Sequence, residues 1–133
     1  VADPEPPQRL VVYQDDLTVV VLNRYPYNNG HLLVAPRRHV GEFGDVAPPE
    51  HTALMGTINR MLSLLKEVMN PDGFNVGLNL GRVAGAGLPG HLHWHIVPRW
   101  SGDTNFMPVL ANTKVIPQAL EALWELLRQK LTE

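Results

Sequence analysis

The stretch Gly90–Trp100, GHLHWHIVPRW, carries a histidine at every second position. Its histidines are His91, His93 and His95, and the positions between them hold Leu92, Trp94 and Ile96. Successive side chains of an extended strand point to opposite faces, so the three imidazoles share one face and the apolar side chains share the other. Alternate positions lie about 6.6 Å apart, which lets one ligand touch two imidazoles. The pattern predicts a strand with one chemical face and one core face.

Two kinds of chemistry use such a row of imidazoles. Neutral imidazole is a common zinc ligand, and a strand with His-x-His supplies two ligands. The sequence contains no cysteine, and His31, His39 and His51 are available as further ligands, although nothing in the sequence places them beside the strand. In the alternative, one imidazole nitrogen attacks an electrophile while its neighbours position the reacting groups. The residues beside the strand decide between the two.

The segment immediately upstream favours the nucleophile. Residues 81–90, GRVAGAGLPG, contain four glycines and no acidic residue. Glycines let backbone N–H groups turn toward one concavity, and such nests bind anionic oxygen. Arg82 and Arg99 add positive potential, whereas a zinc site would be expected to recruit a carboxylate, and the nearest acid downstream is Asp103. We therefore expect phosphoryl chemistry with a histidine nucleophile, and no metal.

The remaining sequence predicts an α+β domain. Apolar and β-branched residues predict strands over Leu10–Gln14, Leu17–Asn23, His31–Pro36 and Phe74–Leu80 and in the histidine segment, which ends at Pro98. Apolar residues at helical spacing predict a long helix from Glu50 to about Asn70 and a C-terminal helix from Ile116. This order favours a mostly antiparallel five-stranded sheet with one long central helix and a C-terminal helix. We expect residues 1–9 to form an extended lead-in and residues 10–133 a single domain.

Composition excludes several classes of protein. A chain of 133 residues that is 44% apolar is large enough for one domain with its own core. The formal net charge of −2, without a clustered basic stripe, argues against nucleic acid as a partner. Apolar runs fall far short of the ~20 residues that span a bilayer, and no basic, apolar leader is present. With no cysteine, we expect a cytoplasmic protein that does not enter membranes.

Three segments of the sequence resemble those of a known family. HLHWHIV, at 91–97, resembles the His-φ-His-φ-His-φ-φ signature (φ apolar) of the histidine triad, or HIT, superfamily of nucleotidyl hydrolases and transferases. NRYPYNNGHLLVAPRRHV, at 23–40, resembles the family's hairpin and the strand ahead of its long helix. The segment from GFNVGLNLG, at 73–81, through PRW and GDTNF resembles the bacterial branch related to diadenosine tetraphosphate phosphorylases. The similarity runs from Leu10 to the C-terminus.

The resemblance implies a HIT-like fold, a homodimer with strands continuing across the interface, and attack on the α-phosphate of an AMP-containing nucleotide without a cofactor. The family nucleophile falls on His93, which would form a nucleotidyl-histidine intermediate that water or inorganic phosphate discharges. The phosphate contact falls on His95, and His91 would help to order the site. His31 would be a partner behind the triad.

The resemblance also implies substrate contacts outside the triad. Asn79 lies near the family's polar phosphate or ribose contact, and Asn23 near a ribose contact in the early strands. Backbone amides of the upstream loop would stabilise charge that develops in the transition state. These loop residues are Gly85, Ala86, Gly87 and Leu88.

That same loop departs from several relatives, which carry Ser or Gln where this sequence has only small and apolar side chains. The preference for a leaving group is therefore left open. A nucleoside phosphoramidase or an adenylyl-sulfate-processing enzyme is the alternative chemistry on the same scaffold. A nucleotide-binding module with low turnover and a histidine-metal protein are the rivals from other classes.

Overall fold

The computed structural model describes residues 10–24, 28–81, 91–103 and 117–132, so the predicted lead-in at residues 1–9 lies outside the described part of the chain. Its elements are β1 (Val11–Gln14), β2 (Thr18–Leu22), β3 (Leu32–Pro36), the 3-10 turn η1 (Phe43–Asp45), α2 (Pro48–Met69), β4 (Gly73–Leu78), β5 (Trp94–Arg99) and α4 (Pro117–Leu131). Among the described helices, none has both the length and the apolar character needed to cross a membrane.

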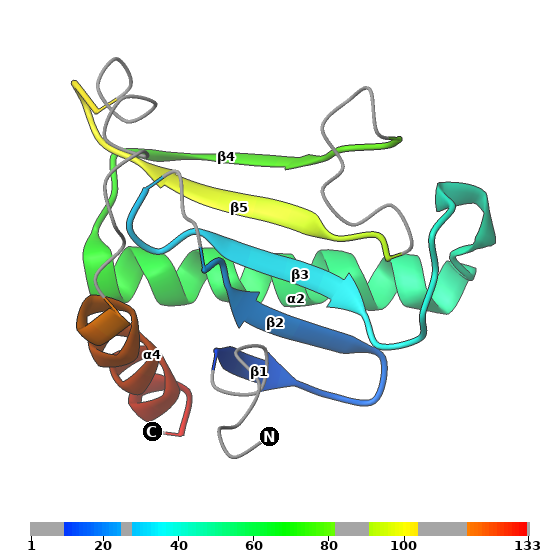
Figure 1. The fold of residues 1–133 in the computed structure, drawn as a ribbon, viewed down its shortest axis with the longest axis horizontal. Coiled ribbons are helices and arrows are strands. Elements are labelled where there is room, and N and C mark those ends of the chain that lie inside the picture. The colour runs from blue at the N-terminus through cyan, green and yellow to red at the C-terminus, as the bar shows by residue number, and fades with distance from the viewer. Residues whose placement is uncertain (1–9, 25–27, 82–90, 104–116, 133) are drawn as a thin grey trace.

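The strands form one antiparallel sheet in the order β1-β2-β3-β5-β4 (Figure 1). The chain completes the hairpins β1–β2 and β2–β3 before α2, and β5 then pairs between β3 and β4. The predicted α+β fold, with five strands, a long helix and a C-terminal helix, is confirmed. β1 and β4 lie at the two edges of the sheet.

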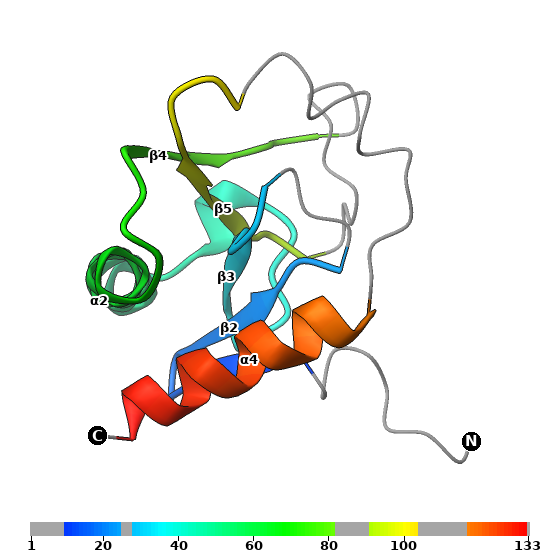
Figure 2. The same ribbon diagram turned by 90° about the vertical axis from the view of Figure 1, so that its left-hand side faces the viewer.

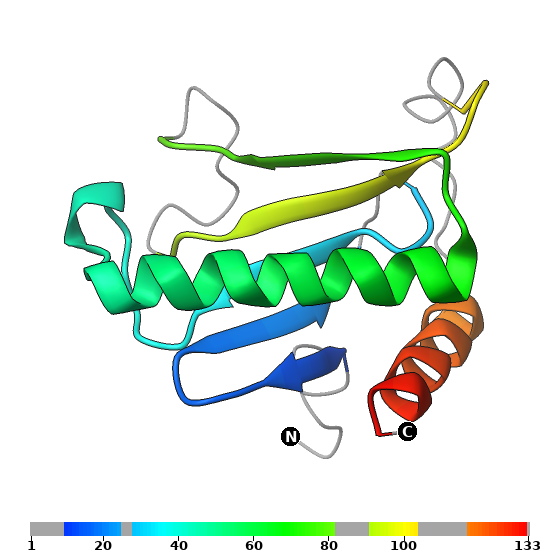
Figure 3. The same cartoon turned by 180° about the vertical axis from the view of Figure 1, so that it is seen from behind.

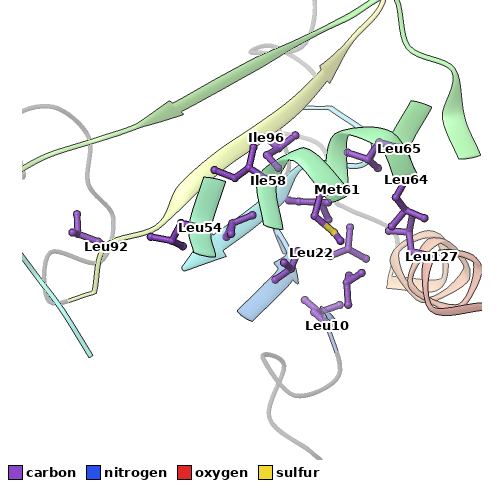
Figure 4. Close-up of a cluster of buried hydrophobic side chains, with 14 of the residues drawn as sticks. Leu10, Leu22, Leu54, Ile58, Met61, Leu64, Leu65, Leu92, Ile96 and Leu127 are labelled. Carbon is purple, nitrogen blue, oxygen red and sulfur yellow. The ribbon is translucent and has the colours of Figure 1, made fainter. Parts of the chain in front are cut away.

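Helix α2 runs along one face of the sheet, as the end-on and rear views show (Figure 2, Figure 3). Alternate strand residues and one stripe of α2 bury each other between these layers (Figure 4). Members of this core include Val20, Leu22, Leu32, Val34, Leu54, Ile58, Met61, Leu65 and Ile96. Since Leu32 and Ile96 face α2, the residues next to them in β3 and β5 point to the other face, which α2 does not cover.

The residues at the start of α2 explain why the helix begins there. Pro48 and Pro49 occupy the first helical positions, where a missing N–H costs nothing. Glu50, three residues after the N-cap Ala47, accepts the Ala47 backbone N–H at 2.8 Å. Its carboxylate also accepts from the Arg38 guanidinium at 2.8 and 3.0 Å. Alanine has no side-chain acceptor, so only the half of the capping box that Glu50 supplies is formed.

Strand β5 begins at Trp94, so His91 and His93 precede it, whereas the sequence pattern placed all three histidines in the strand. The pairing with β3 ends at Val34 and Trp94. Two residues on, Pro36 has no backbone N–H to extend the ladder, and its carbonyl accepts from the His91 ring at 2.9 Å. The apolar positions nevertheless face the core as predicted: Leu92 and Ile96 are buried, and Trp94 packs against the same cluster.

Helix α4 covers the outer edge of β1. The Trp124 indole N–H donates to the Val11 carbonyl at 2.6 Å, and Arg128 donates to the Val12 carbonyl at 3.3 Å. Leu127, between them, is fully buried in the core. Unpaired carbonyls at a sheet edge invite pairing with another chain, so these contacts protect the β1 edge.

Candidate active site

The site lies on the sheet face opposite α2, where His31 and His95 meet. His95 pairs with Leu33 of β3 and Gly77 of β4 and so points away from the core. His31 comes immediately before β3 and reaches the same face. Its Nε2 lies 2.9 Å from Nδ1 of His95, and the two ring centroids are 5.1 Å apart. Two residues 64 positions apart in the chain thus form one hydrogen-bonded pair.

His93 stands next to this pair, with its ring centroid 5.1 Å from that of His95. Its Nδ1 lies 3.0 Å from the backbone carbonyl of His91. A carbonyl only accepts hydrogen bonds, so Nδ1 of His93 carries the proton and donates it. In the neutral ring, the lone pair is then on Nε2. His93 therefore presents the tautomer that a nucleophilic imidazole needs.

His91 contributes to the site through its backbone, because its ring lies in separate surroundings. Nε2 of His91 donates to the Pro36 carbonyl, and the ring lies 5.0 Å from that of the exposed His39. The backbone N–H of Leu92 donates to the Val40 carbonyl at 2.7 Å. These contacts fix the His91 carbonyl that orients His93. The contact with His39 was not predicted from the sequence, because no periodicity links residue 39 to residue 91.

Burial keeps the His31–His95 pair neutral. Loss of hydration at the fully buried His31, with added repulsion from His95 and His93, lowers the pKa of His31 to about 3. Burial also lowers the pKa of His95, and His93 adds to the effect. Each of the two rings therefore carries a single proton near neutral pH. Their hydrogen bond is one between neutral imidazoles.

Asn23 lies behind His31, at the end of β2. Its backbone N–H donates to the His31 carbonyl at 2.8 Å. Its side-chain Nδ2 lies 3.2 Å from Nδ1 of His31 and 3.4 Å from Nε2. The side chain predicted to contact a ribose thus has its amide nitrogen against a histidine ring.

The turn of residues 28–30, which precedes His31, is hydrogen-bonded to the end of β5 and the residues after it. Gly30 has a φ of 81°, a left-handed conformation that suits glycine, and the His31 N–H donates to the Asn28 carbonyl at 3.2 Å. The buried Asn28 amide donates to the Pro98 carbonyl at 2.9 Å and to Asp103 at 2.5 Å. The Arg99 guanidinium beside Asp103, together with backbone and side-chain donors, holds the pKa of that carboxyl well below its usual range. These groups form a fixed polar support beneath the His31 turn.

The structure describes one of the two remaining predicted substrate contacts, Asn79, and does not describe the other, the loop at 85–88. Asn79 is half-buried and follows β4; by strand alternation from Gly77, it belongs to the face that carries His95. The predicted loop contacts at 85–88 lie outside the described residues. Among the residues that the structure does describe, no three His, Asp or Glu side chains come together in a group that would hold a metal ion. The polar side chains described on this face are imidazoles and amides.

Comparisons with known proteins point to one family. A family model described as the HIT domain matches residues 5–102. AP-4-A phosphorylase of Mycobacterium tuberculosis strain H37Rv is 50% identical over 111 residues, which cover 84% of this chain and 57% of that protein. The asymmetrical bis(5'-nucleosyl)-tetraphosphatase of Schizosaccharomyces pombe is 33% identical over 93 residues, 70% of this chain and 50% of that protein. The chain therefore spans only about half the length of these two relatives.

The fold comparison gives the same family. A hypothetical histidine triad nucleotide-binding protein from Sulfolobus tokodaii superposes with a TM-score of 0.79 at 27% identity, covering 92% of this chain and 83% of that one. Because the family model spans more than half of the chain and the relatives share its sequence and fold, this chain belongs to the HIT, or histidine triad, family.

Proposed function

We propose that this chain is a nucleotidyl hydrolase or transferase that attacks the α-phosphate of adenine nucleotides or dinucleoside polyphosphates through Nε2 of His93. The observation that carries the proposal is the hydrogen bond from Nδ1 of His93 to the His91 carbonyl, which leaves Nε2 as the free nitrogen. The neighbouring His95 then serves as the phosphate contact.

The reaction divides into two displacements. Nε2 of His93 attacks the α-phosphorus, the bond from phosphorus to the leaving polyphosphate oxygen breaks, and a nucleotidyl-histidine forms. An oxygen of water or of inorganic phosphate then attacks the same phosphorus, and the P–N bond breaks to return neutral His93. The His91 carbonyl stabilises the positive charge that the ring acquires while it is substituted, because Nδ1–H still donates to it.

The other predicted site residues bind the phosphate or position the histidines that do so. His95 donates a hydrogen bond to a non-bridging phosphate oxygen, and His31, which has no exposed surface, acts through His95. Asn79, on the same face, and the backbone at 85–88 remain predicted contacts for phosphate or ribose. His91 positions His93 through its backbone carbonyl.

We favour a dinucleoside polyphosphate as substrate and inorganic phosphate as acceptor, because AP-4-A phosphorylase is the 50% identical relative. Attack on the adenylyl group by phosphate yields ADP, whereas attack by water yields AMP. The panel that tests this contains diadenosine polyphosphates, adenosine phosphoramidate and adenylyl sulfate, each assayed with and without phosphate.

With diadenosine tetraphosphate and phosphate, we expect ADP and ATP in equal amounts. Turnover of the phosphoramidate or adenylyl sulfate alone would instead support the alternative chemistry on the same scaffold. If nucleotides bind and no member of the panel is consumed, the protein is a binding module and the proposal fails.

We also propose a homodimer in which β4 continues the sheet of a second copy. β4 is the edge that α4 does not cover, and it leaves Val76 42% exposed, with Leu80 just beyond it 50% exposed. Sedimentation analysis should give twice the 14.8 kDa of one chain, and substitution of Val76 by glutamate should shift the protein toward the monomer. A wild-type protein that sediments as a monomer at all concentrations would contradict this arrangement. The cytoplasmic location expected from the sequence stays a prediction.

A further inference from the structure

We propose that Asn23 is a positioning residue that sets the direction of hydrogen bonding through His31 and His95, so that His95 presents an N–H to the phosphate. Asn23 was expected from the sequence as a ribose contact, and this role is a different one. The last step, donation to phosphate, rests on the proposed function. The protonation pattern of the two rings does not depend on it.

The amide nitrogen of Asn23 carries two hydrogens, so it donates hydrogen bonds and cannot accept them. It lies 3.2 Å from Nδ1 of His31 and 3.4 Å from Nε2, and Nε2 is already engaged in the shorter hydrogen bond with Nδ1 of His95. Nδ1 of a neutral His31 therefore accepts from Asn23, and its single proton is placed on Nε2. That proton points at Nδ1 of His95, 2.9 Å away.

The position of the proton on His31 in turn determines the position of the proton on His95. Its Nδ1 accepts from His31, so its own proton is on Nε2, the nitrogen at the far end of the ring. The opposite direction would put a lone pair on Nε2 of His95, and a lone pair repels phosphate oxygen. Two neutral rings in series allow only these two directions. The amide of Asn23 selects the first, while the backbone bond from Asn23 N–H to the His31 carbonyl holds the two residues in register.

The test measures ring protonation directly, by NMR of imidazole ¹⁵N nuclei in the full chain without substrate. We expect His31 and His95 of the wild-type protein both to carry their proton on Nε2. Asn23→Asp keeps the shape of the side chain but replaces the donor with an acceptor. In this variant we expect a proton on Nδ1 of His31. The matched control is Asn59→Asp, which adds the same charge at an exposed position of α2.

Turnover separates this inference from the proposed function. We expect Asn23→Asp to lower kcat for dinucleotide cleavage about 100-fold, as loss of a transition-state donor does elsewhere, and Asn59→Asp to match wild type. A wild-type His31 protonated on Nδ1 overturns the inference even if Asn23→Asp does not fold. The inference is also overturned if Asn23→Asp moves the proton of His31 to Nδ1 and leaves kcat unchanged. Expected NMR patterns in a wild-type protein that cleaves no nucleotide would overturn the proposed function and leave the assigned direction standing.

Discussion

Replacement of His93 by alanine is expected to lower turnover of an adenylated substrate by at least about 10⁴-fold, because the variant has no nitrogen to form the covalent intermediate. AMP binding should persist, since His95 keeps its hydrogen bond with His31. His93 is half-buried at the surface of the site, so the midpoint of thermal unfolding should change little. Steady-state kinetics and calorimetric titration with AMP measure the two effects.

The matched control is His51→Ala, which removes an imidazole from the early part of α2, where it contacts only Phe43 among the described ring contacts. This variant should keep wild-type turnover. If His93→Ala retained activity within tenfold of the wild-type protein, the assignment of the nucleophile would be wrong.

The second large effect is a loss of stability in mild acid. His31 in the unfolded chain takes up a proton near pH 6.5, but in the folded protein its pKa is lowered to about 3. Between these values the unfolded state binds more protons than the folded state. The free energy of unfolding therefore falls as pH falls, by up to about 1.4 kcal/mol per pH unit, and is unaffected by this group above pH 6.5. The lowered pKa of His95 adds a contribution of the same sign.

Denaturant unfolding at a series of pH values from 7 to about 5.5 measures this slope above the pKa values of ordinary carboxyl groups. In His31→Gln the slope should decrease by about the contribution of one proton, whatever the stability of the variant at pH 7. Asn59→Gln, an exchange between two uncharged side chains at an exposed position of α2, should keep the wild-type slope. An equally steep slope in His31→Gln would show that the acid sensitivity has another source.

The alternation of His91–Ile96 predicted correctly which residues face the core, and the helical spacing from Glu50 predicted α2 to within about two residues at each end. Local patterns succeed here because burial on one face imposes a period on the sequence. The predicted start of β5, at His91, was wrong by three residues, because the strand begins at Trp94. The interruption comes from Pro36, on a strand that the local pattern around residue 91 does not include.

Contacts between distant segments could not be derived from spacing. The resemblance to the family pointed to His31 as a partner of the triad, but the sequence did not indicate which histidine it contacts. Nor did it suggest that the side chain of Asn23 faces His31, or that His91 acts through its carbonyl. These relations depend on the register between β2, β3 and β5, which only the folded sheet fixes.

The proposed reaction passes through a covalent nucleotidyl-histidine, which mass spectrometry of the intact protein detects directly. The wild-type chain is mixed with diadenosine tetraphosphate without phosphate, quenched at alkaline pH to protect the P–N bond, and then digested to locate the adduct. The account predicts a mass increase of one adenylyl group on His93, which disappears when phosphate is added and is absent from His93→Ala. Cleavage of the dinucleotide with no adduct at any time, or an adduct on another residue, would contradict it.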